Sequence, residues 1–255
     1  MDVLRAYGDG RIFGEAYGDG PVQVVWLHGW ARSCEDFTSS GSQLANYGIS
    51  SVALDLPGFG ASPLPDAAWR AADYATAVAR ALSQMGEEPV VVVGHSFGGK
   101  VATVLAADYP HLVKALVLTG TPVLRHGGGG RRSPRRFRFL RALHRRGLLS
   151  DDRMEAARRR FGSNDYRNAS GLLRDILVVS VNEGFESELS RVSAPVDLVW
   201  GANDLVVPTD VARAVQTLLV RSPHVELDVL ADTGHLVPTE RPTVLVDHAH
   251  HLASQ

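Results

Sequence analysis

A serine between two glycines is the first residue of this sequence whose setting suggests chemistry. Ser96 lies between Gly94 and Gly98, after the apolar run at 90–93 and before an alanine-rich helical pattern. A strand, a sharp turn and a helix in this order form a nucleophile elbow, which exposes the serine hydroxyl at the edge of a sheet. The alternatives are a tight turn without a catalytic role and a phosphate-binding loop. The sequence does not favour the latter, because Lys100 is followed by valine and no Gly-x-Gly-x-x-Gly is present.

A serine hydroxyl needs a base to accept its proton and an acid to orient that base. His235 is the only one of the 10 histidines in a glycine-flanked loop beyond a late apolar run, and Asp204 follows the late run before it. The order Ser96, Asp204, His235 is a known order for a hydrolytic triad. Asp228 and Asp232 are competing candidates for the acid.

Backbone donors are expected beside the serine. The run at 22–27 ends in His28-Gly29-Trp30, and a glycine after a strand permits a sharp turn. We expect the backbone N–H groups of Trp30 and Phe97 to form an oxyanion hole. The side chains of His28 and His95 either contact substrate or pack internally. Cys34 lacks an elbow and is expected to be a buried thiol.

The elements that position these residues alternate between strand and helix after a short antiparallel hairpin. This alternation predicts an α/β fold with a mostly parallel central sheet that helices cover on both faces. The expected strands lie at 2–7, 11–17, 22–27, 50–55, 90–93, 114–120, 196–201 and 225–230, and the expected helices at 34–47, 68–85, 97–108, 209–219 and 242–252.

The alternation stops between the sixth and seventh strands. Helical patterns at 136–146, 151–161 and 168–181 follow a hinge of four glycines at 127–130. We therefore predict a core formed by 1–121 and 190–255, with residues 122–189 inserted as a helical, arginine-rich cap or lid.

The inserted segment differs in charge from the rest of the chain. Residues 122–185 contain 15 arginines and 6 acidic residues, whereas the whole chain has a net charge of −2. The basic residues either form a solvated surface or recognise an anionic substrate or an acidic carrier protein. Arg131 and Arg135 are candidate substrate contacts, together with Leu205 and Leu236. Nucleic-acid binding is not expected, because the remainder of the chain is acidic.

Composition limits the compartment and the cofactors. Cys34 is the only cysteine, so an internal disulfide is excluded. No apolar run approaches the length of a membrane span, and the first residues lack the apolar core of a signal peptide, so we expect a cytoplasmic protein. No cofactor and no metal are expected, although His248 and His251 could share one helical face.

Five motifs together resemble the α/β-hydrolase superfamily. They are His28-Gly29-Trp30, Asp55-x-Pro57-Gly58-x-Gly60-x-Ser62, Gly94-His95-Ser96-Phe97-Gly98-Gly99, Gly201-x-x-Asp204 and Gly234-His235. This resemblance implies a Ser96-Asp204-His235 triad that cleaves a carboxylic ester or thioester through an acyl-enzyme intermediate. Within the superfamily, the size, the His-Gly-Trp turn and the basic insertion are similar to the pimeloyl-acyl-carrier-protein methyl ester esterases. The layout also resembles a menaquinone-pathway lyase that uses the same triad as a base, and a non-catalytic binding protein of this fold is a third alternative.

Overall fold

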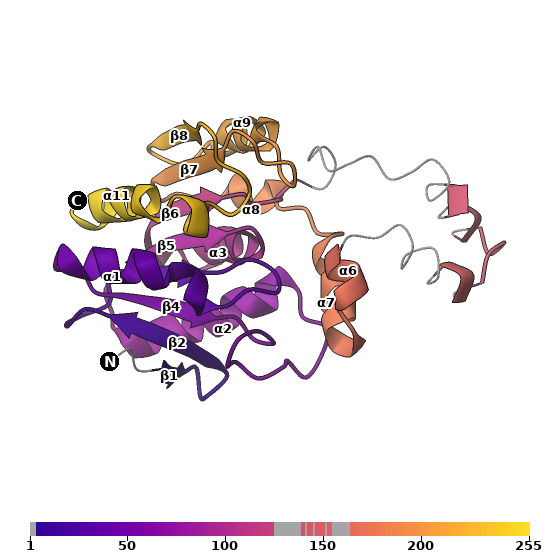
Figure 1. Cartoon of the computed structure of the whole chain (residues 1–255), viewed down its shortest axis with the longest axis horizontal. Coiled ribbons are helices and arrows are strands. Elements are labelled where there is room, and N and C mark those ends of the chain that lie inside the picture. Colours follow the sequence, from indigo (N-terminus) through magenta and orange to yellow (C-terminus); the bar gives the residue numbers. More distant parts are fainter. Residues whose placement is uncertain (1–3, 125–138, 141, 145, 151, 155–163) are drawn as a thin grey trace.

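The computed structural model shows one eight-stranded sheet with helices on both faces (Figure 1). It describes residues 4–124, 139–140, 142–144, 146–150, 152–154 and 164–255. The strand order is β1-β2-β4-β3-β5-β6-β7-β8. Strand β2 pairs antiparallel with both β1 and β4, and all other neighbouring strands pair parallel. The strands are β1 (Leu4–Tyr7), β2 (Ile12–Tyr17), β3 (Val24–Leu27), β4 (Ser51–Asp55), β5 (Val90–His95), β6 (Val113–Thr119), β7 (Val196–Gly201) and β8 (Val225–Leu230).

The helices connect these strands in the expected order. They are α1 (Thr38–Asn46), α2 (Ala71–Met85), α3 (Phe97–Asp108), α6 (Asn164–Asn168), α7 (Gly171–Ser180), α8 (Glu186–Leu189), α9 (Thr209–Leu218), α10 (Val237–Glu240) and α11 (Pro242–Ala253), with 3-10 turns at Cys34–Phe37 and Pro110–Leu112. Helix α2 begins three residues later than expected, because the Asp73 carboxylate accepts the backbone N–H of Arg70 at 2.8 Å and caps the first turn. Helices α8 and α10 were not predicted, since four residues are too few to show a helical period.

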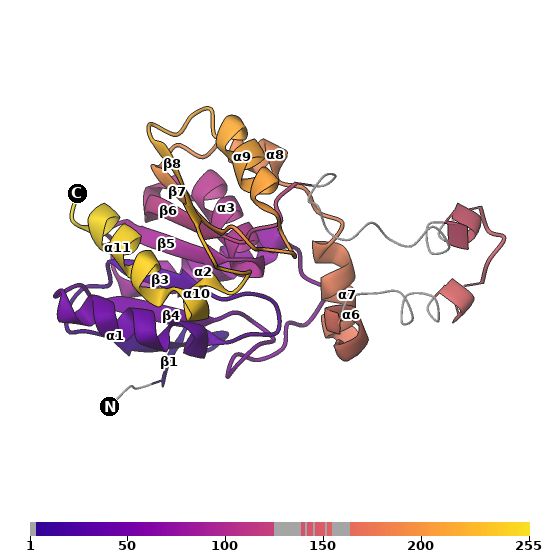
Figure 2. The same ribbon diagram turned by 45° about the horizontal axis from the view of Figure 1, so that its top comes forward.

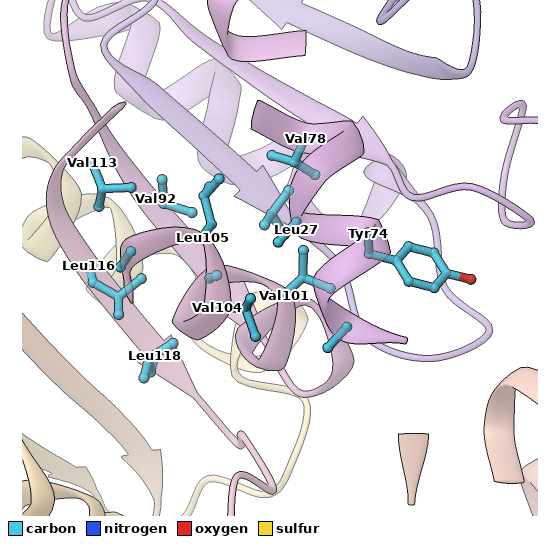
Figure 3. Close-up of a cluster of buried hydrophobic side chains, with 14 of the residues drawn as sticks. Leu27, Tyr74, Val78, Val92, Val101, Val104, Leu105, Val113, Leu116 and Leu118 are labelled. Atoms are coloured by element: carbon cyan, nitrogen blue, oxygen red, sulfur yellow. The ribbon is translucent and has the colours of Figure 1, made fainter. Parts of the chain in front are cut away.

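The core has two layers, one on each face of the sheet. In β5, Val90 and Val92 belong to a buried cluster that includes residues of α2, α3 and α9, whereas Val91 and Val93 belong to one that includes residues of α1 and α11. Successive side chains of a strand point to opposite faces, so a strand that is buried on both sides must be apolar throughout. Figure 2 shows the two helical layers, and Figure 3 shows part of the first layer, where valines and leucines of α3 meet side chains of β3, β5 and β6.

The predicted fold class is confirmed, including an insertion after the sixth strand. The described part of this insertion contains α6, α7 and α8. Helices α6 and α7 lie beside the sheet and outside both helical layers, whereas α8 packs against α3 (Figures 1 and 2). The expected helix at 168–181 is observed as α7, from Gly171 to Ser180. Within the expected helices at 136–146 and 151–161, residues 139–140, 142–144 and 152–154 are helical. Residues 136–138, 141, 145, 151 and 155–161, and the glycine hinge at 127–130, lie outside the described residues. Within the described residues, no helix combines the length and hydropathy needed to cross a lipid bilayer.

Candidate active site

The turn between β5 and α3 holds Ser96 in a conformation that side chains rarely adopt. Its backbone has φ 50° and ψ −108°, and its N–H donates to the Thr119 carbonyl at 2.9 Å. Gly98 donates its N–H to the His28 carbonyl at 3.0 Å, and a Cβ at Gly98 would overlap the Leu27 carbonyl. A Cβ at Gly94 would lie 2.6 Å from the Gly99 Cα. The glycines therefore let α3 pack against β3 and β5, and this packing supports the strained turn.

Ser96, His235 and Asp204 form one hydrogen-bonded chain at the carboxyl edge of the sheet. The Ser96 Oγ lies 3.3 Å from His235 Nε2, and His235 Nδ1 lies 2.8 Å from Asp204 Oδ2. The other Asp204 oxygen accepts the N–H groups of Val206 and Val207, each at 2.8 Å. The Asp204 side chain is almost fully buried and that of His235 is 17% exposed. A serine–histidine distance of this length is common in enzymes without bound substrate.

The loop that carries His235 is held by close backbone packing and by a carboxylate that the sequence reading missed. A Cβ at Gly201 would overlap the Gly234 carbonyl, and a Cβ at Gly120 would lie 2.9 Å from the His235 ring. Glu240 accepts the backbone N–H of Gly234 at 2.6 Å and that of Leu236 at 3.1 Å. Both neighbours of His235 are thus bonded to one side chain. The spacing of five residues after His235 was the only signal of this contact in the sequence.

The two histidines that were considered as substrate contacts are internal. His28 is fully buried, lies 2.7 Å from the Gly29 carbonyl through Nδ1, and accepts the Leu56 N–H through Nε2 at 3.0 Å. His95 is 1% exposed, and its Nε2–H donates to the His235 carbonyl at 3.0 Å. Burial, with the nearby His235, lowers the pKa of His95 to about 3, so this ring stays neutral. These contacts favour the packing alternative for both side chains.

The backbone N–H groups of Trp30 and Phe97 have no hydrogen-bond acceptor among the described residues. Trp30 precedes Ala31, which has φ 54°, in a turn closed by the Arg32 N–H and the Gly29 carbonyl at 3.3 Å. Phe97 is the first residue of α3, where N–H groups have no partner within the helix. The two rings pack edge to face with their centroids 5.4 Å apart. The site therefore offers free donors next to an aromatic surface.

Asp55, at the end of β4, joins the loop that follows this strand to the turn that begins at Cys34. Its carboxylate accepts the N–H of Cys34 at 2.6 Å and that of Ala61 at 2.7 Å. Ser62 donates its hydroxyl to the Asp55 carbonyl at 2.5 Å. Cys34 is buried, and burial, with the charge of Asp55, raises the pKa of its thiol to about 12. Cys34 is therefore an unreactive thiol at neutral pH, as expected, and this loop motif has a structural role.

A buried lysine connects the elbow helix to the inserted segment. Lys100, on α3, donates to the Ser180 carbonyl at 2.8 Å and lies 3.2 Å from the Ser180 hydroxyl, at the end of α7. Burial lowers the pKa of Lys100 to about 8, opposed by the charge of Glu183. Glu183 in turn accepts the Ala71 N–H at 3.3 Å, at the start of α2. The end of α7 is thus bonded to α3, and the next turn of chain is bonded to α2.

Two of the other predicted substrate contacts, Leu205 and Leu236, directly follow Asp204 and His235 in the chain. Leu205 is 88% exposed and Leu236 is partly buried. Arg131 and Arg135 lie outside the described residues. Of the competing acids, Asp232 is exposed and Asp228 faces His248 at 3.5 Å, so Asp204 alone of the three bonds to His235. Exposed Asp165, on α6, interacts electrostatically with His235.

A mostly parallel sheet with a serine elbow and a neighbouring histidine and aspartate defines the α/β-hydrolase class of enzymes. Residues 24–248 match the sequence model of the alpha/beta hydrolase family, and the chain belongs to this family. The family assignment agrees with the resemblance carried by the five motifs. The protein is therefore a hydrolase-family enzyme.

The individual relatives carry names of different activities. The chain is 29% identical over 245 residues to a dihydrolipoyllysine-residue acetyltransferase component of the acetoin cleaving system of Cupriavidus necator. This alignment covers 88% of this chain and 61% of that relative. It is 30% identical over 259 residues to lipase LipV of Mycobacterium tuberculosis, covering 90% of this chain and 92% of the relative. The bromoperoxidase structure from Bacillus anthracis superposes with a TM-score of 0.74 over 100% of both chains, at 18% identity, which supports the fold alone.

Proposed function

We propose that this protein is a serine hydrolase that cleaves a carboxylic ester or thioester with Ser96, His235 and Asp204. The observation that carries the proposal is the continuous hydrogen-bonded chain from the Ser96 hydroxyl through His235 to the buried Asp204 carboxylate. The similarity to a lipase over 90% of this chain supports the same class of reaction.

The geometry suggests a role for each side chain in this series of hydrogen bonds. Asp204 Oδ2 accepts a hydrogen bond from His235 Nδ1–H, so the ring proton stays on Nδ1 and the unprotonated Nε2 faces Ser96. As the Ser96 oxygen attacks the substrate carbonyl carbon, His235 Nε2 takes the hydroxyl proton and then transfers it to the departing alcohol or thiol. A water molecule attacks the resulting acyl-enzyme through the same histidine, and the acid is released. Asp204 stabilises the imidazolium in both steps.

The negative oxygen of each tetrahedral intermediate would be bound by the N–H groups of Trp30 and Phe97. Both donors are free of internal partners among the described residues, and the first turn of α3 adds the positive end of its dipole. Trp30 packs on Phe59 with ring centroids 5.0 Å apart, next to Phe97. This aromatic group provides an apolar wall for an acyl chain.

Residues 122–189 are proposed to form the cap over this site. A Cβ at Gly58 would lie 3.1 Å from Leu173, so α7 packs on the loop after β4. The arginines of this segment favour an anionic substrate or an acidic carrier protein as partner. The similarity to pimeloyl-acyl-carrier-protein methyl ester esterases and the cytoplasmic location stay predictions.

A substrate panel with wild type and Ser96→Ala tests the proposal. The panel contains short p-nitrophenyl esters, an acyl thioester of a small thiol, and the same acyl group on an acyl carrier protein. We expect wild type to hydrolyse esters and Ser96→Ala to lose on the order of 10⁴-fold in kcat. Substitution at Ser96 removes one hydroxyl, so the melting temperature should change by no more than a few degrees.

The same panel distinguishes the other functions. Retained turnover in Ser96→Ala would exclude Ser96 as the nucleophile. Turnover of a menaquinone-pathway intermediate without ester hydrolysis would indicate the lyase, and failure of wild type to label with a fluorophosphonate would indicate a binding protein. A higher kcat/KM for the carrier-bound acyl group than for the small thioester would support an acidic carrier as partner.

A further inference from the structure

A second group of ionisable side chains lies at the opposite end of β7 and β8 from Ser96. Asp197 is the second residue of β7, and its register partner on β8 is Glu226. His224 immediately precedes β8, two residues before Glu226. Because alternate residues of a strand share a face, His224 and Glu226 point to the same side of the sheet as Asp197.

The side chains of this group are close enough to bind one ion. Asp197, His224 and Glu226 each provide one ligand atom, and these atoms all lie within 4.8 Å of one another. Ligand bonds of about 2.1 Å in a tetrahedral site place ligand atoms about 3.4 Å apart. His224 and Glu226 have side chains that are 61% and 57% exposed. His224 Nε2 lies 3.7 Å from Glu226 Oε2, so small side-chain rotations would bring the ligand atoms to this spacing.

Asp197 supplies an independent indication that a ligand is bound here. Its side chain is 3% exposed, and its Oδ1 is buried without a hydrogen-bond partner among the described residues. Its Oδ2 accepts the Nδ1–H of His248, on α11, at 2.7 Å. Buried carboxylate oxygens are nearly always paired, and an unpaired one calls for an explanation such as an ion. A cation between Asp197, His224 and Glu226 would satisfy this oxygen.

His248 has the position of an orienting residue for such a ligand. It bonds one oxygen of Asp197, while its Nε2 faces the Asp228 carboxylate at 3.5 Å. A hydrogen bond to the second oxygen of a metal-binding carboxylate fixes its direction and is typical of metal sites. The arrangement would also attach the edge strand β8 to β7 and, through His248, to α11.

We propose that Asp197, His224 and Glu226 bind a divalent transition-metal ion, with Zn²⁺ as the best fit. One imidazole nitrogen with two carboxylate oxygens suits Zn²⁺ and its neighbours better than Mg²⁺ or Ca²⁺, which prefer oxygen ligands alone. No metal was expected from the sequence, because Asp197 lies 27 residues before His224 and only the β7–β8 register brings them together. The site is structural and is separate from the proposed serine chemistry.

Isothermal titration calorimetry of the tag-free, EDTA-treated protein with ZnCl₂ tests the site. We expect one Zn²⁺ per chain in wild type. His224→Ala and Glu226→Gln should each weaken binding by at least 10-fold. His251→Ala is the matched control, because His251 is an exposed histidine on α11 outside this group, and it should bind Zn²⁺ as wild type does.

A second measurement keeps the test independent of enzyme activity and of folding. Zn²⁺ should raise the melting temperature of wild type and of His251→Ala, but not of the double variant His224→Ala, Glu226→Gln, whose two substitutions are at exposed positions. The proposal is overturned if wild type binds no stoichiometric Zn²⁺, if the double variant binds as tightly as wild type, or if CaCl₂ binds as tightly as ZnCl₂. Because no substrate is present, these results are independent of the role of Ser96.

Discussion

Replacing Asp204 with asparagine should leave the site assembled and remove its chemistry. Asp204 Oδ1 accepts two backbone N–H groups at 2.8 Å, so the amide oxygen of an asparagine must occupy that position. The amide NH₂ would then face His235 Nδ1, which Asp204 Oδ2 now contacts at 2.8 Å. A donor at that point forces the imidazole proton onto Nε2, and His235 can then no longer accept the proton of Ser96.

The expected loss follows from this change of tautomer. In a comparable triad, the same substitution lowers kcat by about 10⁴-fold, which corresponds to roughly 5.5 kcal/mol of transition-state free energy. In the folded state, the hydrogen bonds from Val206 and Val207 lose the charge of their acceptor and the hydrogen bond to His235 reverses direction, which costs about 1–2 kcal/mol. We therefore expect a small fall in melting temperature together with a large fall in kcat.

The assay is kcat for a p-nitrophenyl ester at saturating substrate, with circular dichroism and thermal melting on the same samples. Asp232→Asn is the matched control, because Asp232 is exposed and has φ 52°, a conformation that asparagine adopts readily. It should retain wild-type kcat. If Asp204→Asn keeps more than about a tenth of the activity, or if Asp232→Asn loses as much, the reasoning from the two backbone N–H groups is refuted.

Two further predictions concern residues that support the site. Glu240→Gln leaves one acceptor oxygen for the N–H groups of Gly234 and Leu236, so the loop with His235 should loosen and kcat/KM should fall about 10-fold. Glu87→Gln, at an exposed position, is the control and should have no effect on kcat/KM. An unchanged kcat/KM in Glu240→Gln would show that this contact does not position His235. A separate prediction concerns Lys100, because burial lowers the pKa of this side chain from 10.5 to about 8. The unfolded chain therefore holds this proton more tightly than the folded protein does. The free energy of unfolding should rise with pH between about 8 and 10, by on the order of 3 kcal/mol. Urea unfolding at several pH values should show this rise in wild type relative to Lys100→Met, and a constant difference between the two proteins would contradict it.

The elements and their order were readable from local patterns. The valine run at 90–93 predicts a strand that is buried on both faces, and the structure places alternate valines in the two core layers. The glycines around Ser96 predict a close approach of strand and helix, and the Cβ overlaps at Gly94 and Gly98 agree with this. Such features are determined by residues near one another in the chain, so a linear sequence contains them.

Contacts between distant segments needed the tertiary structure. The sequence favoured Asp204 over Asp228 and Asp232 as the acid, and the direction of each side chain shows that Asp204 bonds to His235. Likewise, nothing local indicates that Lys100 bonds to Ser180, 80 residues later. The sequence determined the fold class and proposed the serine site, because both follow from local periodicity and turns. The tertiary structure decided which polar groups meet, because a side chain's partner depends on strand register and on how loops cross at the sheet edge.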